Sequence, residues 1–202
     1  MPITKLDPKT ALVAIDLQRG IVAMPALPDP AGVVAKAARL AAAFRGAGLP
    51  VVLVHVTFAP DGSDAVKTRT DVPSSGVKPT AEFAEFVDEL AVAPADILVT
   101  KRQWGAFYGT DLDLQLRRRG VTGIVLCGIS TSIGVESTAR NAWEHGYNIA
   151  FAADAMADMR PEAHQNSIER IFPRIGEVGT TADILAKLEE RSPMIGEVVA
   201  EP

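Results

Sequence analysis

Short runs of apolar residues alternate along this chain with segments of helical spacing. The runs lie at residues 11–15, 51–56, 97–100, 123–127 and 147–153, with a shorter sixth at 176–178. Apolar and polar residues do not alternate within them, as they would in a strand with one face in water. Such runs, separated by helices, are typical of parallel strands buried on both faces. The sequence therefore predicts an α/β fold with three layers: a doubly wound, mostly parallel six-stranded sheet, Rossmann-like, with helices on both faces.

Helices are expected between these strands, at residues 30–47, 110–119, 131–145, 161–172 and 181–190. Thr110 is expected to cap the second helix, whose last turn carries three arginines where the helix dipole favours cations. Residues 58–77 are rich in Gly, Pro, Ser and Asp, which predicts a long surface loop near the ends of the strands. The residues after Arg191 follow no clear pattern.

The composition is typical of one domain, 1–202, and argues against several classes of function. The chain has 202 residues, of which 48% are hydrophobic, and a net charge of −5. No basic run indicates nucleic-acid binding, no apolar run is long enough to span a membrane, and no signal peptide is evident. The single Cys127 has no partner for an internal disulfide, so a cytoplasmic protein is expected. Glycine-rich phosphate-binding motifs are absent from the sequence, so no nucleotide cofactor is expected.

Polar residues follow three of the expected strands. Asp16 comes directly after the first run, Lys101 after the third, and the turn at 128–134 after the fourth. In open parallel sheets, ligands bind at the carboxyl ends of the strands, where these residues would meet. A partly buried carboxylate there can act as a general acid or base, and backbone N–H groups can hold an anion. Each residue also has a plainer interpretation, as a turn aspartate, a solvated lysine or a capped strand–helix connection.

Three motifs together resemble the isochorismatase-like hydrolases, also called cysteine hydrolases. They are Ala-Ile-Asp-Leu-Gln at 14–18, Lys-Arg-Gln-Trp-Gly-Ala-Phe at 101–107 with Thr-Asp-Leu at 110–112, and Cys-Gly-Ile-Ser-Thr-Ser-Ile-Gly-Val-Glu-Ser-Thr-Ala-Arg at 127–140. Asn-Ala at 141–142 and His-Gly-Tyr at 145–147 continue the third motif. The resemblance spans about residues 10–190 and is strongest to the YecD-like group of the family.

The resemblance implies a triad of Asp16, Lys101 and a cysteine at the position of Gly134. It also implies a non-proline cis peptide between Ile129 and Ser130, which would direct the N–H groups of Ser130 and Gly134 at a substrate oxygen. Trp104 flanks the lysine and can form a wall of the pocket, whereas Phe107 is expected to pack in the core. The candidate substrate-binding residues are Gln18, Trp104, Ile129, Ser130 and Thr131.

Gly134 departs from the family's triad, because a glycine cannot attack a substrate. Cys127 lies seven residues earlier and is typical of a small buried residue. Family members that cleave a vinyl ether resemble this pattern, since they also lack the cysteine and use an aspartic acid as proton donor. We therefore expect hydrolysis of a small carboxylated or amide-like substrate by acid catalysis through Asp16. Lys101 would orient Asp16, tune its pKa and favour a carboxylate on the substrate.

Two alternatives remain open at the level of sequence. One is a catalytically degenerate small-molecule binding protein on an amidase scaffold. The other is an amidase with a hydroxyl nucleophile, for which the candidates are Ser130, Thr131, Ser132 and Ser137 and the sequence reveals no histidine base.

Neither a metal nor another cofactor is expected. Nicotinamidases of the family bind a metal through an aspartate and histidines after the second strand, where this chain has His-Val-Thr-Phe at 55–58. His55 is instead a candidate rim residue, and His145 and His164 lie far apart on expected helices. Glu136 and Arg140, four residues apart on a helix, are expected to pair. The resemblance implies a small-molecule substrate and a homodimer or homotetramer, with no nucleic-acid or membrane partner.

Overall fold

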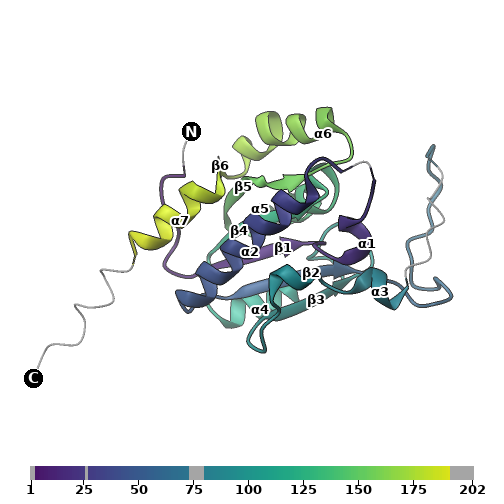
Figure 1. Cartoon of the computed structure of the whole chain (residues 1–202), viewed down its shortest axis with the longest axis horizontal. Coiled ribbons are helices and arrows are strands. Elements are labelled where there is room, and N and C mark those ends of the chain that lie inside the picture. The colour runs from purple at the N-terminus through teal and green to yellow at the C-terminus, as the bar shows by residue number, and fades with distance from the viewer. Residues whose placement is uncertain (1–2, 26, 73–79, 192–202) are drawn as a thin grey trace, which may run out of the picture.

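A parallel sheet forms the centre of the computed structural model, which describes residues 3–25, 27–72 and 80–191 (Figure 1). Its strands run side by side in the order β3-β2-β1-β4-β5-β6, and each neighbouring pair is parallel. They are β1 (Thr10–Ile15), β2 (Val51–Val56), β3 (Ile97–Lys101), β4 (Gly123–Ile129), β5 (Asn148–Ala157) and β6 (Glu177–Gly179). The strand order reverses direction between β1 and β4, which confirms the doubly wound α/β fold.

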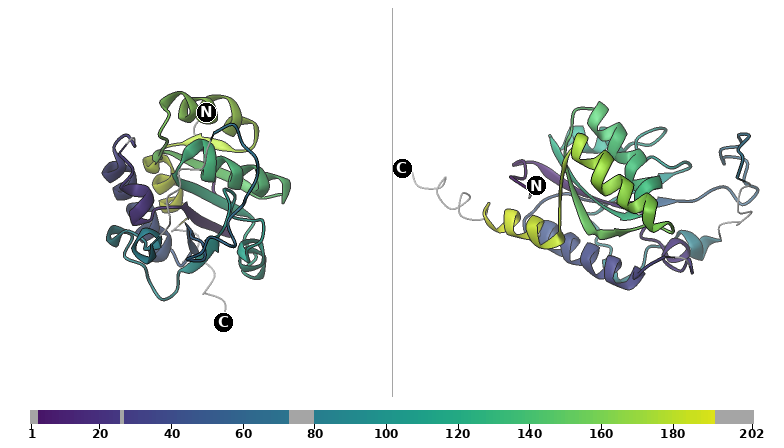
Figure 2. Two further views of the ribbon diagram at one scale, coloured as in Figure 1. Left: turned by 90° about the vertical axis from the view of Figure 1, so that its right-hand side faces the viewer. Right: turned by 90° about the horizontal axis from the view of Figure 1, so that it is seen from above.

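Helices cover both faces of the sheet, as the apolar strands require (Figure 2). On one face, α2 (Pro30–Gly46) and α7 (Thr181–Glu189) pack on Leu12, Leu53 and Val125. On the other face, α4 (Leu112–Arg118) and α5 (Glu136–Glu144) cover Val13, Ile15 and their neighbours. The residues that follow α6 (Pro161–Asn166), including Phe172, pack on the same cluster. Two short helices, α1 (Arg19–Val22) and α3 (Ala81–Ala84), lie together near the carboxyl ends of the strands.

Several elements differ from the sequence prediction at their ends. The helix expected at 131–145 begins as a π-helical turn, Thr131–Val135, before α5. The helix expected at 161–172 likewise changes after α6 into a π-helical turn, Ser167–Ile171, and then a 3-10 turn, Phe172–Arg174. Another 3-10 element, Asp88–Leu90, precedes β3. Such turns displace side chains from regular helical spacing, so periodicity alone does not reveal them.

The predicted cap of α4 is shifted by one residue. Asp111, not Thr110, is the N-cap, although the Thr110 hydroxyl still accepts a hydrogen bond from the Leu112 N–H at 3.2 Å. The predicted loop is seen over residues 58–72, which contain no helix or strand and extend beyond the carboxyl edge of the sheet (Figures 1 and 2). Its remainder, and the tail after Arg191, lie outside the described residues. In the described ranges, no helix is long and apolar enough to cross a membrane.

Candidate active site

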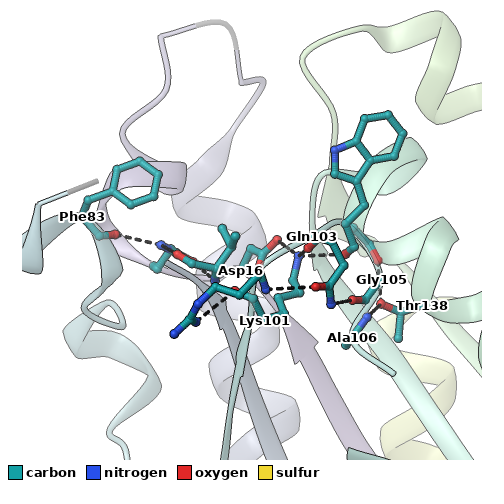
Figure 3. Close-up of polar contacts among 12 residues, drawn as sticks. Asp16, Phe83, Lys101, Gln103, Gly105, Ala106 and Thr138 are labelled. Atoms are coloured by element: carbon teal, nitrogen blue, oxygen red, sulfur yellow. Dashed lines mark hydrogen bonds and ion pairs between the residues drawn. The ribbon is translucent and has the colours of Figure 1, made fainter. Parts of the chain in front are cut away.

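Asp16 and Lys101 form a buried ion pair at the carboxyl edge of the sheet (Figure 3). Asp16 follows β1 and has a φ of 54°, in a region that aspartate tolerates better than most residues. Lys101 ends β3, and its side chain extends past the end of β2 to place Nζ 2.7 Å from Asp16 Oδ2. Their side chains are only 8% and 2% exposed. The pairing of these residues, expected from their positions after two strands, is therefore present.

The two oxygens of the Asp16 carboxyl have different surroundings. Oδ2 accepts the hydrogen bond from Lys101, whereas Oδ1 is buried and makes no hydrogen bond with any described residue. Burial raises the pKa of Asp16 to about 6, against the opposing effect of the Lys101 charge and hydrogen bond. A carboxyl group with this pKa exchanges its proton near neutral pH, as a general acid must.

Gly134 lies in the π-helical turn directly beside this pair. A Cβ atom at position 134 would be 3.1 Å from Asp16 Oδ2, 3.4 Å from Lys101 Nζ and 2.9 Å from Ile15 Cγ2. Any side chain here would therefore point at the ion pair. The peptide bond between Ile129 and Ser130, just before the turn, is cis, as the resemblance implied.

A cavity of about 1150 Å³ opens above these residues. Asp16, Lys101 and Gly134 line it, as do three of the predicted substrate-binding residues: Trp104, Ile129 and Ser130. Its other walls come from α1 and the residues after it, the loop 58–72, the segment after β3, the π-helical turn with α5, and the segment after β5. They include Ile21, Met24, Phe58, Arg102, Tyr108, Ile133, Asn141 and Met159. Large apolar pockets with a few polar groups are the usual form of small-molecule sites.

Trp104 lies at the cavity and Phe107 lies in the core, as the sequence suggested. Trp104 lines the cavity with 65% of its surface exposed, whereas Phe107 is buried and stacks on His145 at 5.1 Å between ring centres. Glu136 and Arg140 form the expected ion pair on α5, with Oε1 and Nη2 2.9 Å apart.

Two predicted substrate-binding residues do not line the cavity. The Gln18 side chain is fully buried, and its Nε2 donates to the carbonyl oxygens of Val56 and Phe83 at 3.0 and 2.9 Å. Its Oε1 accepts from the Val56 N–H at 2.8 Å, so the amide joins β2 to α3. Thr131 is also fully buried, with its hydroxyl 2.8 Å from His164 Nδ1. Both side chains, which the sequence predicted to bind substrate, are thus bonded within the protein.

His55, the candidate rim residue, is likewise occupied. Its Nδ1 lies 2.7 Å from the Ala84 carbonyl oxygen and its Nε2 2.8 Å from the Thr100 hydroxyl, and its ring stacks on Phe86. The side chain therefore connects β2, β3 and α3 and does not line the cavity.

The contact between Thr131 and His164 was missed by sequence reasoning. Burial lowers the pKa of His164, partly offset by the charge of Asp158. Asp158 accepts hydrogen bonds from the N–H and the hydroxyl of Ser132, both at 2.8 Å. These contacts join the turn after β4 to the segment after β5. Only the tertiary fold brings the two segments together, so no spacing in the sequence could have revealed the pair.

The described residues offer no obvious metal centre. In the three described ranges, no group of three or more His, Cys, Asp or Glu side chains is placed to hold a metal ion. Cys127 lies fully buried in β4, where burial raises the pKa of its thiol to about 12. A thiol with this pKa is not a nucleophile at neutral pH.

Comparison with known proteins agrees with this fold. The model of the isochorismatase domain matches residues 10–183. The chain belongs to the isochorismatase family. It is 51% identical over 180 residues to the uncharacterized isochorismatase family protein YecD of Escherichia coli O157:H7, covering 89% of this chain and 96% of YecD.

Solved and functionally named members of the isochorismatase family are also similar. The structure of an isochorismatase family protein from Burkholderia thailandensis matches with a TM-score of 0.89 and 52% identity, over 93% of this chain and 99% of that one. The ureidoacrylate amidohydrolase RutB of Methylobacterium radiotolerans is 32% identical over 203 residues, covering 88% of this chain and 79% of RutB. This isochorismatase-family chain is therefore related to hydrolases, amidohydrolases among them.

Proposed function

We propose that this protein hydrolyses a small carboxylated or amide-like substrate by acid catalysis through Asp16, without a thiol. The observation that carries the proposal is the asymmetry of the Asp16 carboxyl. Lys101 fixes Oδ2, while Oδ1 has no partner among the described residues and the group has a pKa of about 6. Such a carboxyl can hold a proton and present it to a ligand in the cavity.

A vinyl ether is the substrate chemistry that this arrangement serves most directly. The Asp16 carboxyl gives its proton to the methylene carbon, which leaves a cation on the carbon that carries the ether oxygen. Water adds to that carbon and returns a proton to the Asp16 carboxylate. The resulting hemiketal then breaks into an alcohol and a ketone. For an amide-like substrate, water would add to the carbonyl carbon, the Asp16 proton would go to the nitrogen as the C–N bond breaks, and the proton lost by the water would return to the Asp16 carboxylate.

Lys101 and Gly134 have supporting roles in this mechanism. The ammonium of Lys101 donates to Asp16 Oδ2 and holds the carboxyl in one orientation. Gly134 packs closely against the pair: a Cβ atom there would lie 3.1 Å from Asp16 Oδ2 and 2.9 Å from Ile15 Cγ2, so a side chain would press on the carboxyl and on Ile15. A glycine therefore leaves the Asp16 carboxyl undisturbed in its contact with Lys101.

The proposal is tested by hydrolysis of isochorismate, a vinyl ether, in D₂O. The ketone product should gain one deuterium on the carbon that was the methylene group, and Asp16→Asn should slow the reaction by at least a hundredfold while circular dichroism shows an intact fold. Unchanged turnover in Asp16→Asn would refute the proposal.

The second candidate function is a small-molecule binding protein that has lost its reaction. The observation in its favour is the same position 134, where a side chain would contact both members of the ion pair. An amidase scaffold that has lost its nucleophile would have no reactive side chain at this position. This second candidate function predicts that ligands bind in the cavity and are released unchanged.

An amidase with a hydroxyl nucleophile is less favoured than either. Thr131 has a histidine partner in His164, but its side chain is fully buried and does not line the cavity. Ser130 lines the cavity, yet none of the described histidines contacts its hydroxyl. Mass spectrometry after incubation with reactive amides should accordingly show no covalent adduct.

A further inference from the structure

The ammonium group of Lys101 is fully occupied by the protein. It donates to Asp16 Oδ2 at 2.7 Å and to the carbonyl oxygens of Gln103 and Trp104 at 3.2 and 2.8 Å (Figure 3). An ammonium has three protons to donate, so none remains for a substrate. Lys101 is therefore a positioning residue, and the expectation that it attracts a substrate carboxylate is better met by another cation.

Arg102 is the other cation among the described residues that line the cavity. It directly follows β3, and its side chain is 40% exposed. Nε donates to Asp64 Oδ2, and Nη1 makes a long contact of 3.5 Å with the Lys101 carbonyl oxygen. Nη2 makes no hydrogen bond with the described residues. One edge of the guanidinium is thus held, and the other still has donors for a ligand.

Asp64 fixes the orientation of this guanidinium. Its Oδ1 accepts from the Ala59 N–H at 2.7 Å, while its Oδ2 accepts from Arg102. The carboxylate is therefore anchored within the loop 58–72, which forms one wall of the same cavity. Because Asp64 engages Nε, the Nη1–Nη2 edge remains for the planar, two-point contact that arginine makes with carboxylates.

The surfaces around Arg102 indicate the rest of the ligand. Phe58, Trp104, Tyr108 and Met159 line the cavity with apolar or aromatic surface. The two carboxylates of Asp61 and Asp71 also line it, which opposes the binding of anions in general. A ligand that suits these walls places a carboxylate at Arg102 and carries an apolar or planar body.

We infer that Arg102 is the specificity-determining residue that binds the substrate's carboxylate through its Nη edge. The inference rests on the proposed function, because it places the substrate in the same cavity. It assigns separate roles to adjacent residues: Lys101 orients the acid, and Arg102 selects the substrate.

The test compares acids with their uncharged amides as ligands. Binding of benzoate and benzamide, cinnamate and cinnamamide, and 3-phenylpropionate and its amide is measured by titration calorimetry. The wild type should prefer the acid by about tenfold or more in at least one pair, because a charge-assisted hydrogen bond is stronger than a neutral one. In Arg102→Gln that preference should disappear, with the affinity for the amide unchanged. Arg102→Lys keeps the positive charge but lacks the planar guanidinium that donates two parallel hydrogen bonds. It should therefore show a preference between those of the wild type and Arg102→Gln.

A matched control separates a direct contact from an effect of net charge. Arg39 is exposed on α2 and does not line the cavity, so Arg39→Gln changes the net charge equally and should leave the preference intact. The inference is overturned if the wild type shows no preference in any pair. It is equally overturned if Arg102→Gln retains the preference, or if Arg39→Gln loses it to the same extent.

The same titrations distinguish this inference from the proposed mechanism. Asp16→Asn should bind the acids with the wild-type preference, because the contact with Arg102 does not require proton transfer. If turnover survives in Asp16→Asn while Arg102→Gln loses the preference, the acid mechanism fails and the role of Arg102 stands. If the preference survives in Arg102→Gln while Asp16→Asn is inactive, the role of Arg102 fails and the acid mechanism stands.

Discussion

Lys101 Nζ lies 2.7 Å from Asp16 Oδ2 and makes no hydrogen bond with Oδ1, so the carboxyl has one anchored and one available oxygen. Asp16 is buried, and its pKa is raised to about 6. These two facts give the site a proton donor that is fixed in place. They also determine how activity should depend on pH.

We predict that kcat/KM falls as the pH rises through about 6. Only the protonated Asp16 can donate, and each pH unit above its pKa reduces that form about tenfold. Asp16 is half protonated at pH 6, so activity should be lower at pH 8 than at pH 6 by about fiftyfold. A pH–rate profile with a stable buffer series measures this. Activity that increases steadily from pH 6 to pH 8 would identify a base or a thiolate in place of an acid.

Gly134→Cys should place a reactive thiol in the cavity. The new Cβ would lie 3.1 Å from Asp16 Oδ2 and 3.4 Å from Lys101 Nζ, after a small shift of the Ile15 methyl group. Cys127 is fully buried and its pKa is about 12, so the native wild type should resist alkylation. Mass spectrometry after brief iodoacetamide treatment should find one adduct on the variant, at position 134. Equal labelling of wild type and variant would contradict this placement.

Trp104 should contribute to binding and not to stability. It is 65% exposed and lines the cavity, so Trp104→Ala should weaken ligand binding about tenfold and change the unfolding free energy by less than about 0.5 kcal/mol. Trp143 is a matched control, because it is 54% exposed and does not line this cavity. Calorimetric titration and urea unfolding of both variants measure the two effects. Equal losses of affinity in both variants would mean that Trp104 has no special contact.

Gln18 should contribute to stability and not to ligand binding. Its buried amide makes three hydrogen bonds, two to Val56 and one to Phe83, and Gln18→Leu would leave those backbone groups without partners. We expect this variant to lose about 2–4 kcal/mol of unfolding free energy, because buried polar groups would be unsatisfied. Urea unfolding measures the loss. A variant of wild-type stability but reduced ligand affinity would restore Gln18 to the list of substrate contacts.

The architecture could be predicted from the sequence because burial leaves a direct pattern. The run 51–56 is exactly β2, since a strand covered on both faces consists almost entirely of apolar residues. The pairing of Asp16 with Lys101 followed from the same pattern, because both residues come at the carboxyl ends of strands. What the sequence did not reveal is that β2 separates the two strands and that the long lysine side chain bridges this gap.

The contacts within the site were less predictable than its position. Gln18 and Thr131 belong to the same sequence motifs as Trp104 and Ser130. In the structure, however, the Gln18 side chain bonds to backbone groups and the Thr131 hydroxyl bonds to His164. Short polar motifs do not indicate which way a side chain turns. The Arg102 contact with Asp64 joins residues 38 positions apart, through a loop without periodicity, so only the structure reveals it.

The central claim is that Asp16 supplies the proton and that no thiol is needed. The most direct measurement is turnover of isochorismate, beside a panel of small amides and carbamoyl compounds, by wild type, Asp16→Asn and Gly134→Cys in parallel. The account predicts that wild type cleaves the vinyl ether and that Asp16→Asn does not. An inactive wild type, with amide hydrolysis appearing only in Gly134→Cys, would contradict it and identify an amidase scaffold that now serves to bind.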